Sequence, residues 1–392
     1  MPKKIYDHKI LGRDLKLFTF PRSTPGYAFW HPAGVILYEI ILNYIRDLLK
    51  DLDYQEIKTP TIFNTELFKK SGHFDNYKDK MYFCGNKKEW GIKPMNCPES
   101  MLVFNEYMRT YKDLPLRFSD FGVLHRAEQA GEINGLFRAR EFVIDDAHIY
   151  CTFAQIKKEI ADLIVLVTEV YQKFGFSEYK VELSTRPKKF IGDEKTWDKA
   201  ENELKEILRD KKIKFKENKG EGAFYGPKID FHIKDSLSRS WQLGTIQLDF
   251  ASTKRLEVNF INERGEKENP VLIHRALLGS LERFIAILLE HTAGALPFWL
   301  SPIQAIVLPI TERHAEYANK ILEELKKEDI RAEIDQRNET LPKKIRDAEL
   351  QKIPYMLVVG DKEAKNQKVA VRSREKGDLG QKTINELENL LK

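Results

Sequence analysis

Apolar residues recur at helical spacing near the start of the chain. Between positions 31 and 51, one helical face collects Val35, Leu37, Ile40, Ile41, Tyr44, Ile45, Leu48 and Leu49. Charged residues end the segment, so the pattern predicts an amphipathic helix that packs on a core. A strand is expected next, over 54–59. Pro60 follows it, and a strand end tolerates the missing amide donor of a proline.

Helical and strand patterns then follow in groups. Helical spacing predicts helices over 98–112, 153–174, 196–211 and 276–292. β-rich patterns predict strands over 116–125, 178–184, 228–234, 240–250 and 255–260. The polar connection 126–135 predicts a long hairpin. Several consecutive strands without helices between them indicate an antiparallel sheet, hence an α+β domain with flanking helices.

The pattern changes after Gly294, Pro297 and Pro302, which mark a domain boundary. Beyond it, short strands and helices alternate: strands are predicted over 305–308, 332–335, 355–359 and 369–371, and helices over 315–327, 341–350 and 383–391. This alternation is typical of a smaller α/β domain with a mixed sheet. We therefore expect one domain over 1–298 and a second over 302–392.

Composition limits the class of protein. The 392 residues are 42% hydrophobic and 32% charged, which is enough apolar material for packed cores and excludes a disordered chain. The net charge of +5 is too small to identify a nucleic-acid binder by itself. Three cysteines cannot all pair, and neither a signal core nor an apolar membrane span is present. A cytoplasmic protein without membrane contact is expected.

Residues 137–148 form the most informative segment. If it is a strand, one face carries Arg138, Arg140, Phe142, Ile144, Asp146 and His148 along about 33 Å. Such a face could hold phosphates, stack a base and bind a small polar substrate. The alternative is an ordinary solvated strand face. Arg126 and Glu128, in the hairpin before it, add a cation and an acceptor and favour the functional interpretation.

Cys97, His148 and His274 are a second candidate set. A lone cysteine is more often a small buried residue than a ligand, and these three positions have no local metal-binding spacing. Chemically, one thiolate and two imidazoles suit zinc and leave positions open for a substrate. Residues 220–228 are rich in glycine but lack the Ser/Thr and the strand-to-helix setting of a phosphate loop, so any ATP must be bound differently.

Several longer strings point to a known family. They are Lys70–Asp79, Lys93–Pro98, Asp145–His148, Glu221–Lys228, Trp241–Phe250 and His274–Phe284. Through them the chain resembles, over nearly its whole length, the threonyl-tRNA synthetases of the class II aminoacyl-tRNA synthetase family. The resemblance implies a class II antiparallel sheet flanked by helices. Its three motifs would be the helix and strand ending at Pro60, the hairpin 116–148 and the unit ending at Arg283.

The resemblance also implies an ATP site. Arg126 would contact the α-phosphate, Glu128 the adenine edge and Phe142 one adenine face. Arg283 would cover the other face and reach the γ-phosphate, which Arg138 would also contact. Gln242 belongs to the same group, and Mg²⁺ would accompany ATP. In a straight strand Gln242 and Gln247 face opposite ways, so a bulge is expected near Gly244 if both are to reach the site.

A threonine site follows from the same comparison. Cys97, His148 and His274 would hold one Zn²⁺, which receives the amino nitrogen and hydroxyl oxygen of threonine. Asp146 would accept the hydroxyl proton. The pocket would be lined by Met95, Tyr225 and Gln247. An apolar pocket separates threonine from valine by only about 100-fold, whereas a site that binds the hydroxyl reaches about 10⁴ or more.

The implied reaction is that of a threonine–tRNA ligase. It activates L-threonine with ATP to threonyl-adenylate and then transfers it to the 3′-terminal adenosine of the tRNA for threonine. His73 resembles the residue that helps to deprotonate that ribose, although a histidine in such a loop is more often structural. The second domain resembles an anticodon-binding domain, with contacts expected from Asn338, Arg346, Glu363 and Arg372. A homodimer is the family expectation.

Some positions depart from the family pattern. They are Leu243, Ile144, Glu141, Val143 and Glu99–Ser100. The chain also begins at the catalytic core without an N-terminal editing region, so we expect measurable attachment of serine, which lacks only a methyl group worth about 1–3 kcal/mol. Two alternatives are a non-catalytic tRNA-binding or regulatory paralogue and a sister synthetase for serine, proline or histidine. The presence of Arg126, Arg283 and the Cys/His set argues against the non-catalytic paralogue. The Cys/His set together with Asp146 argues against a sister synthetase.

Overall fold

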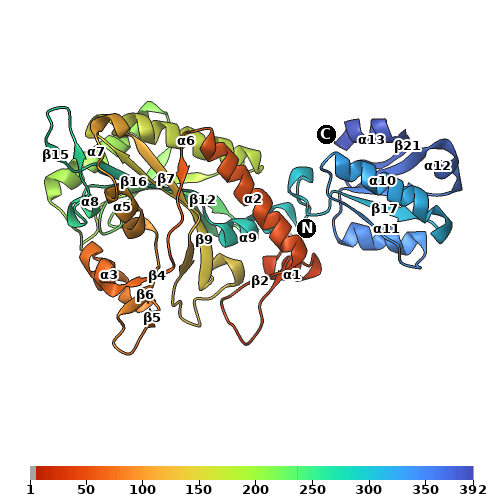
Figure 1. Ribbon diagram of the computed structural model, residues 1–392, viewed down its shortest axis with the longest axis horizontal. Coiled ribbons are helices and arrows are strands. Elements are labelled where there is room, and N and C mark those ends of the chain that lie inside the picture. Colours follow the sequence, from red (N-terminus) through yellow and green to blue (C-terminus); the bar gives the residue numbers. More distant parts are fainter. Residues whose placement is uncertain (1–5, 236, 392) are drawn as a thin grey trace. The chain divides into compact units, whose positions relative to one another are not determined.

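The computed structural model describes residues 6–235 and 237–391 (Figure 1). The chain forms two compact units, each described here by itself. Residues 20–28 and 44–287 make up one, which we call the sheet unit. The described residues of 1–19, 29–43 and 288–392 make up the other, the composite unit. The domain limits of 1–298 and 302–392 stay a prediction.

A large sheet organises the sheet unit. Its strands lie in the order β11, β10, β12, β13, β16, β9, β7 and β3, and β8 pairs with β9. In chain order they are β3 (Gln55–Glu56), β7 (Leu116–Asp120), β8 (Val123–His125), β9 (Glu141–Cys151), β10 (Lys180–Ser184), β11 (Phe215–Asn218), β12 (Lys228–Lys234), β13 (Ser240–Asp249) and β16 (Val271–Ser280). The pairs β3–β7 and β10–β11 are parallel, while the strands between are antiparallel. The predicted antiparallel sheet is confirmed.

Helices cover the two faces of this sheet differently. Tyr171 of α6 (Ile156–Lys173) contacts Phe231 of β12, so α6 lies on one face. On the opposite face Ser100 of α5 (Cys97–Asn105) hydrogen-bonds Tyr150 of β9 at 2.8 Å. The other helices of the sheet unit are α3 (Thr65–Ser71), α4 (His73–Tyr77), α7 (Glu194–Asp210), α8 (Ser252–Arg255) and α9 (Leu281–Thr292), of which residues 288–292 belong to the composite unit. A small sheet of β4 (Ile62–Asn64), β6 (Trp90–Ile92) and β5 (Phe83–Cys84) precedes α5.

Several predicted boundaries are wrong. The helix expected from Ala276 begins only at Leu281, because residues 271–280 form β16, whose backbone pairs with β13 and β9. The strand expected over 255–260 is replaced by α8 and the two-residue strand β14 (Phe260–Ile261), which pairs with β15 (Lys267–Glu268). The helix expected over 98–112 ends at Asn105. In each case pairing or a turn overrides an apolar run whose period was ambiguous.

The composite unit contains a mixed sheet in the order β18, β17, β19, β20, β21. These strands are β17 (Ala305–Pro309), β18 (Ala332–Ile334), β19 (Tyr355–Val359), β20 (Lys368–Ser373) and β21 (Gly377–Thr383). The unit's helices are α1 (His8–Asp14), α10 (Ala315–Lys327), α11 (Leu341–Leu350), α12 (Asp361–Asn366) and α13 (Ile384–Leu391). β1 (Phe18–Thr19) pairs with β2 (Phe29–Trp30), and the predicted first helix is α2 (Pro32–Lys50). The mixed α/β prediction is confirmed, although β21 and α12 were missed.

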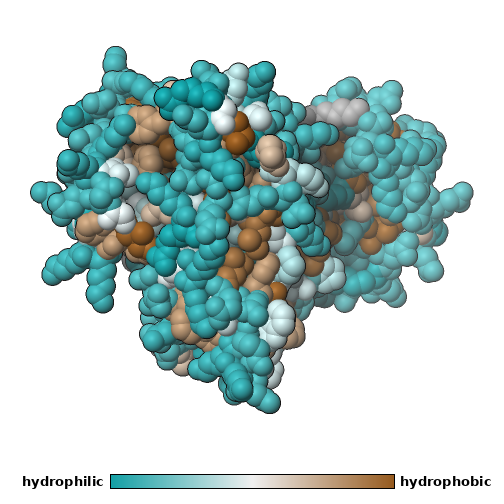
Figure 2. Space-filling view, turned by 60° about the vertical axis from the view of Figure 1, so that its left-hand side comes forward, coloured by the Kyte–Doolittle hydropathy of each residue, from teal (hydrophilic) through white to brown (hydrophobic). Residues whose placement is uncertain are grey.

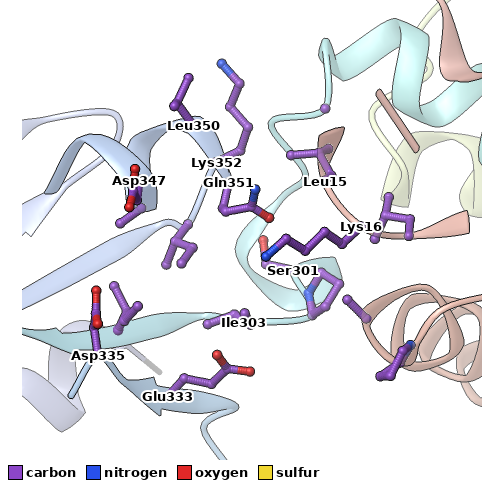
Figure 3. A pocket seen from close by; sticks show the side chains of 18 of the residues that line it. Leu15, Lys16, Ser301, Ile303, Glu333, Asp335, Asp347, Leu350, Gln351 and Lys352 are labelled. Atoms are coloured by element: carbon purple, nitrogen blue, oxygen red, sulfur yellow. The ribbon is translucent and has the colours of Figure 1, made fainter. Parts of the chain in front are cut away.

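A pocket of about 1050 Å³ lies within the composite unit (Figure 3). Its lining mixes charged and apolar side chains, among them Lys16, Glu333, Asp335, Ile303 and Leu350. Among the residues that the structure describes, no predicted site residue lines it. The candidate chemistry therefore has to be sought on the sheet unit.

Hydrophilic side chains dominate the visible surface and separate its hydrophobic areas from one another (Figure 2). The face in Figure 2 is mostly hydrophilic, with smaller hydrophobic areas between. Within residues 6–235 and 237–391, no helix combines the length and apolarity that a bilayer crossing needs.

Gly226 offers a test of the close packing between β13 and the turn that precedes β12. A Cβ atom at Gly226 would lie 1.6 Å from the carbonyl oxygen of Leu248. We expect Gly226→Ala to lower the free energy of unfolding by about 3 kcal/mol, at the upper end for overpacking. Gly131→Ala is the control, because nothing lies within 4 Å of that position. Urea denaturation measures both, and equal stabilities would contradict the packing described here.

Candidate functional site

A row of polar side chains crosses one face of the large sheet. The register aligns Lys228 of β12 with Gln247 of β13, Gln247 with His274 of β16, and His274 with His148 of β9. Residues directly opposite each other in antiparallel strands project to the same side, so these four share one face. We call it the site face. α5 covers part of it, because Tyr150 has the same orientation as His148.

A second row lies beside the first, two residues away on each strand. It contains Asp230, Thr245, Ala276 and Asp146. The methyl group of Ala276 is the smallest side chain of the row, which leaves room above the sheet beside Asp146. The two rows together make a polar floor about four strands wide, or roughly 15 Å at about 4.8 Å per strand.

The predicted bulge near Gly244 is confirmed. Thr245 pairs with Asp230 and Gln242 pairs with His232, so β13 advances three positions where β12 advances two. The extra residue turns Gln242 toward the site face. Its Nε2 donates to Asp230 Oδ1 at 2.6 Å, and Thr245 Oγ1 donates to the same oxygen at 2.8 Å.

Cys97, His148 and His274 converge on the site face. One ligand atom from each lies within 4.8 Å of the other two. Cys97 opens α5, while the two histidines stand opposite each other on β9 and β16, with ring centroids 5.1 Å apart. Sequence spacing could not reveal this cluster, because the sheet register brings the histidines together.

The chemistry of this cluster fits a metal ion. His148 is 1% exposed, yet within the described chain neither ring nitrogen has a hydrogen-bond partner. A buried polar atom without a partner costs about 1–3 kcal/mol. Burial lowers the pKa of His148 well below its usual value, so the imidazole is neutral, the form that binds metals. Sulfur with two imidazole nitrogens is a donor set that suits Zn²⁺ and leaves an open position.

Asp249 orients one of these ligands and was missed in the sequence. Its Oδ2 lies 3.1 Å from His274 Nε2, and its Oδ1 accepts from the backbone amides of Ala251 and Ser252. The carboxylate is fully buried. An acid that fixes the second nitrogen of a histidine commonly orients a metal ligand. The period of two along β13 could have found it, since Asp249 follows Gln247 on the same face.

His73 lies against the cluster. Its Nε2 is 3.3 Å from Cys97 Sγ and its Nδ1 is 2.8 Å from Ser71 Oγ. The ring is 2% exposed, and burial lowers the pKa of His73 to about 4. The imidazole is therefore neutral and fully engaged inside the protein.

The residues predicted to bind the amino acid surround the cluster. The ring of Tyr225 lies 5.0 Å from that of His274, and Met95 packs on the core cluster that contains Cys97. Asn96 Nδ2 donates to Asp146 Oδ2 at 3.3 Å, and burial raises the pKa of Asp146 to about 6. Gln247 Nε2 donates to the carbonyl oxygen of Gly226 at 3.1 Å.

Three arginines gather on the neighbouring part of the site. Burial and the charges of Arg126 and Arg138 lower the pKa of Arg283 to about 10. Arg283 is held by the carbonyl oxygens of Phe137 and Gln242, both at 3.0 Å. Like charges so close together repel, which makes the group a binding place for an anion such as a polyphosphate.

An aromatic plate and an acid complete this part. Arg126 lies over the ring of Phe142, with its guanidinium carbon 5.1 Å from the centroid. Glu128 is 9% exposed and accepts from Lys80 Nζ at 2.7 Å. Lys80, absent from the sequence prediction, thus fixes the acid expected to contact adenine. The predicted alternating face holds only from Phe142 to His148, because Arg138 and Arg140 precede β9.

Behind the site face, a buried ion pair joins β9 to β16. Asp145 accepts from the backbone amides of Leu277 and Leu278 at 2.8 and 3.0 Å and from Arg275 Nη1 at 3.3 Å. Both charged side chains are fully buried. Arg275 also lies over the ring of Tyr54, 5.0 Å from its centroid. The pair clamps the irregular end of β16, where the register to β9 shifts.

The four predicted anticodon contacts come from separate segments of the composite unit. Asn338 follows β18, Arg346 is on α11, Glu363 is on α12 and Arg372 is on β20. Arg372 pairs with Glu349 of α11 at 3.1 Å. Glu363 accepts from Gln381 Nε2 at 2.7 Å. Arg372 therefore contacts the helix that carries Arg346, whereas Glu363 contacts β21.

Two family descriptions match the chain. Residues 80–292 match "tRNA synthetase class II core domain (G, H, P, S and T)", and residues 304–392 match "Anticodon binding domain". A threonine–tRNA ligase of Caldanaerobacter subterraneus subsp. tengcongensis is 50% identical over 388 residues, which are 98% of this chain and 60% of the relative. A threonine–tRNA ligase of Desulforamulus reducens is 51% identical over 375 residues, or 95% and 59%. This chain thus spans about 60% of the length of these curated relatives.

A solved structure resembles nearly the entire chain. It is the crystal structure of the RNA binding domain of threonyl-tRNA synthetase from Cryptosporidium parvum Iowa II, at 43% identity and a TM-score of 0.94. The match covers 98% of this chain and 97% of that one. The likeness therefore includes both the large sheet and the second domain.

The Asp145–Arg275 pair can be tested by removing one partner. Asp145→Ala leaves a buried guanidinium and two backbone amides without their acceptor, and we expect a loss of about 3–5 kcal/mol in the free energy of unfolding. Asp198→Ala is the matched control, because Asp198 pairs with Arg186 at the surface and is 62% exposed. That change should cost less than about 1 kcal/mol. Urea unfolding followed by tryptophan fluorescence distinguishes them, and a similar cost for both would argue against the clamp.

Proposed function

The chain belongs to the class II aminoacyl-tRNA synthetases, and from this premise we propose that it is a threonine–tRNA ligase. It activates L-threonine with ATP to threonyl-adenylate and pyrophosphate, and then transfers the threonyl group to the 3′-terminal adenosine of its tRNA. One observation supports this specificity above others: Cys97, His148 and His274 lie within 4.8 Å beside the arginine group on one sheet face. A thiolate and two imidazoles there suit an amino acid that carries a hydroxyl group.

Cys97, His148 and His274 would hold Zn²⁺, which when bound supplies Lewis-acid coordination for the amino and hydroxyl groups of threonine. Asp146, held by Asn96, accepts the hydroxyl proton. Met95, Tyr225 and Gln247 close the pocket around the methyl group. Valine offers no hydroxyl and leaves these polar groups unpaired, so discrimination of about 10⁴ or more is expected.

Adenylate formation depends on positioning and on neutralised charge. Arg126 binds the α-phosphate, and Arg138 and Arg283 bind the γ-phosphate, with Mg²⁺ accompanying ATP. Phe142 stacks on adenine while Glu128 accepts from its edge, and Gln242 completes the ATP site. The threonine carboxylate attacks the α-phosphorus in line and pyrophosphate leaves, a step that needs little covalent help from protein groups.

tRNA charging adds further roles. Asn338, Arg346, Glu363 and Arg372 contact anticodon bases, and His73 helps to deprotonate the terminal ribose once it exchanges its contact with Cys97 for that hydroxyl. Exposed apolar side chains at Phe29, Val35 and Ile36 support a homodimer. The free cysteines support a reducing, cytoplasmic location.

Two other functions compete with this proposal. A non-catalytic tRNA-binding or regulatory paralogue could keep the fold but would not need three clustered arginines and a complete Cys/His set. A sister synthetase for serine, proline or histidine would not need this set beside Asp146. The ligase therefore accounts for more of the site than either alternative.

ATP–pyrophosphate exchange separates these functions. With zinc-replete protein we expect exchange with threonine, weaker exchange with serine and none above background with valine, because the site binds a hydroxyl group. The control is the same protein with proline or histidine. No exchange with any amino acid would favour the paralogue, and preference for another amino acid would favour a sister enzyme.

Metal affinity gives an independent readout of the Cys/His set. We expect the unsubstituted protein to bind one zinc ion per chain and Cys97→Ser to lose it in competition with a chelating dye. Asp249→Asn should weaken zinc binding by about 10–100-fold, because the carboxylate orients His274. Asp198→Asn is the control for a change of charge at the surface. Equal zinc affinity of D249N and the unsubstituted protein would contradict the assigned role of Asp249.

A further inference from the structure

Asp230 is a buried acid that the proposed mechanism does not use, and it lies at the centre of a network of polar side chains. It lies on β12 and is 3% exposed. Both of its oxygens are engaged by side chains. Oδ1 accepts from Gln242 Nε2 at 2.6 Å and from Thr245 Oγ1 at 2.8 Å, while Oδ2 accepts from Lys228 Nζ at 2.7 Å and from Ser184 Oγ at 2.9 Å.

The network lies between the two halves of the site. Lys228 stands in the same cross-strand row as Gln247 and His274, so its ammonium rises from the site face on the side of the metal-binding set. Gln242 belongs to the other half, because its backbone carbonyl oxygen accepts from Arg283 Nη1 at 3.0 Å. Asp230 contacts both Lys228 and Gln242 and so joins the two halves.

The carboxylate also decides which atom Gln242 presents. Since Nε2 donates to Asp230, the amide oxygen is left to face away from it. Gln242 then offers an acceptor, which suits a ribose hydroxyl and not a phosphate oxygen. Lys228 is only 19% exposed in its side chain, and its ammonium is held at one point instead of sampling many rotamers.

We propose that Asp230 is a positioning residue for adenylate formation, which acts by fixing the amide of Gln242 and the ammonium of Lys228 on the site face. This inference rests on the proposed function, because it assigns a role within the same reaction. Asp230 itself touches no substrate. Its contribution is geometric, and a displacement of about 1 Å in such groups can cost about 10²-fold in rate.

The first test is Asp230→Asn, which is nearly isosteric but no longer pairs with Lys228. We expect threonine-dependent ATP–pyrophosphate exchange to fall by at least about 10-fold. Ser184→Ala is the matched control, since it removes a donor to the same carboxylate on the side away from Gln242, and it should stay within about two-fold. Asp230→Glu keeps the charge but shifts it by one methylene, and it should also lose at least about 10-fold if placement matters.

The second test is a mutant cycle in which Asp230 is one side and the pair Gln242 and Lys228 is the other. Asp230→Asn is introduced into a chain that already carries Gln242→Ala and Lys228→Met. If Asp230 acts through those two residues, the added change costs less than about two-fold there, whereas a merely structural acid costs the same in both backgrounds. For variants whose exchange is too slow to follow, ATP affinity measured by titration calorimetry replaces the exchange rate. Thermal unfolding confirms that each variant is folded.

The outcomes separate the two proposals. Active unsubstituted protein with an equally active D230N, or an equal cost in both backgrounds, overturns the role of Asp230 and leaves the proposed function standing. No threonine-dependent exchange in the unsubstituted protein overturns the proposed function and this inference with it. A large loss in D230N that vanishes in the double background supports both.

Discussion

The pairing register of β12, β13, β16 and β9 is the constraint on which the site depends. Lys228, Gln247, His274 and His148 stand in one row only because each strand pairs at this offset. Side chains alternate along a strand, so a slip by one residue would turn the row to the opposite face of the sheet. The Cys/His set, the proposed amino-acid site and the polar network around Asp230 would be lost together.

Like-charged neighbours, more than backbone contacts, distinguish the arginines of the candidate site from the structural arginines. Arg140 donates to the carbonyl oxygens of Glu128 and Pro25, and Arg275 is paired with Asp145, so both cations are used by the protein itself. Arg283 also donates to two backbone carbonyl oxygens, but it lies close to Arg126 and Arg138, and burial with like charge lowers its pKa to about 10. A cluster of cations that repel one another is what an incoming polyphosphate can stabilise.

The sequence could predict most of the fold but only part of the site. Periodicity located α2, α6 and α10 and the mixed second sheet, because their patterns are long and regular. It failed at 276–280, where a continuous apolar run fits a buried strand as well as a helix. The convergence of Cys97 with two remote histidines followed from resemblance and not from spacing, since only the sheet register brings His148 opposite His274. Asp249 and Asp230 carried a signal, the period of two on β12 and β13, but neither was assigned a role, although Asp249 lies within the family string Trp241–Phe250.

The two halves of the site differ in how firmly the protein holds them. Beside the Cys/His set, three polar groups are each fixed by a partner: His274 by Asp249, Asp146 by Asn96, and Gln247 by a backbone carbonyl. Asp249 ends a paired strand and Asn96 directly precedes a helix, positions that hold a side chain more precisely than a loop does. On the ATP side, Arg138 is 44% exposed and comes from the irregular connection before β9. A firmly held site for the proposed amino acid, beside a more exposed cation group for the proposed nucleotide, is the arrangement expected where specificity must precede chemistry. Discrimination by one hydroxyl group requires that the polar groups that bind it keep their positions.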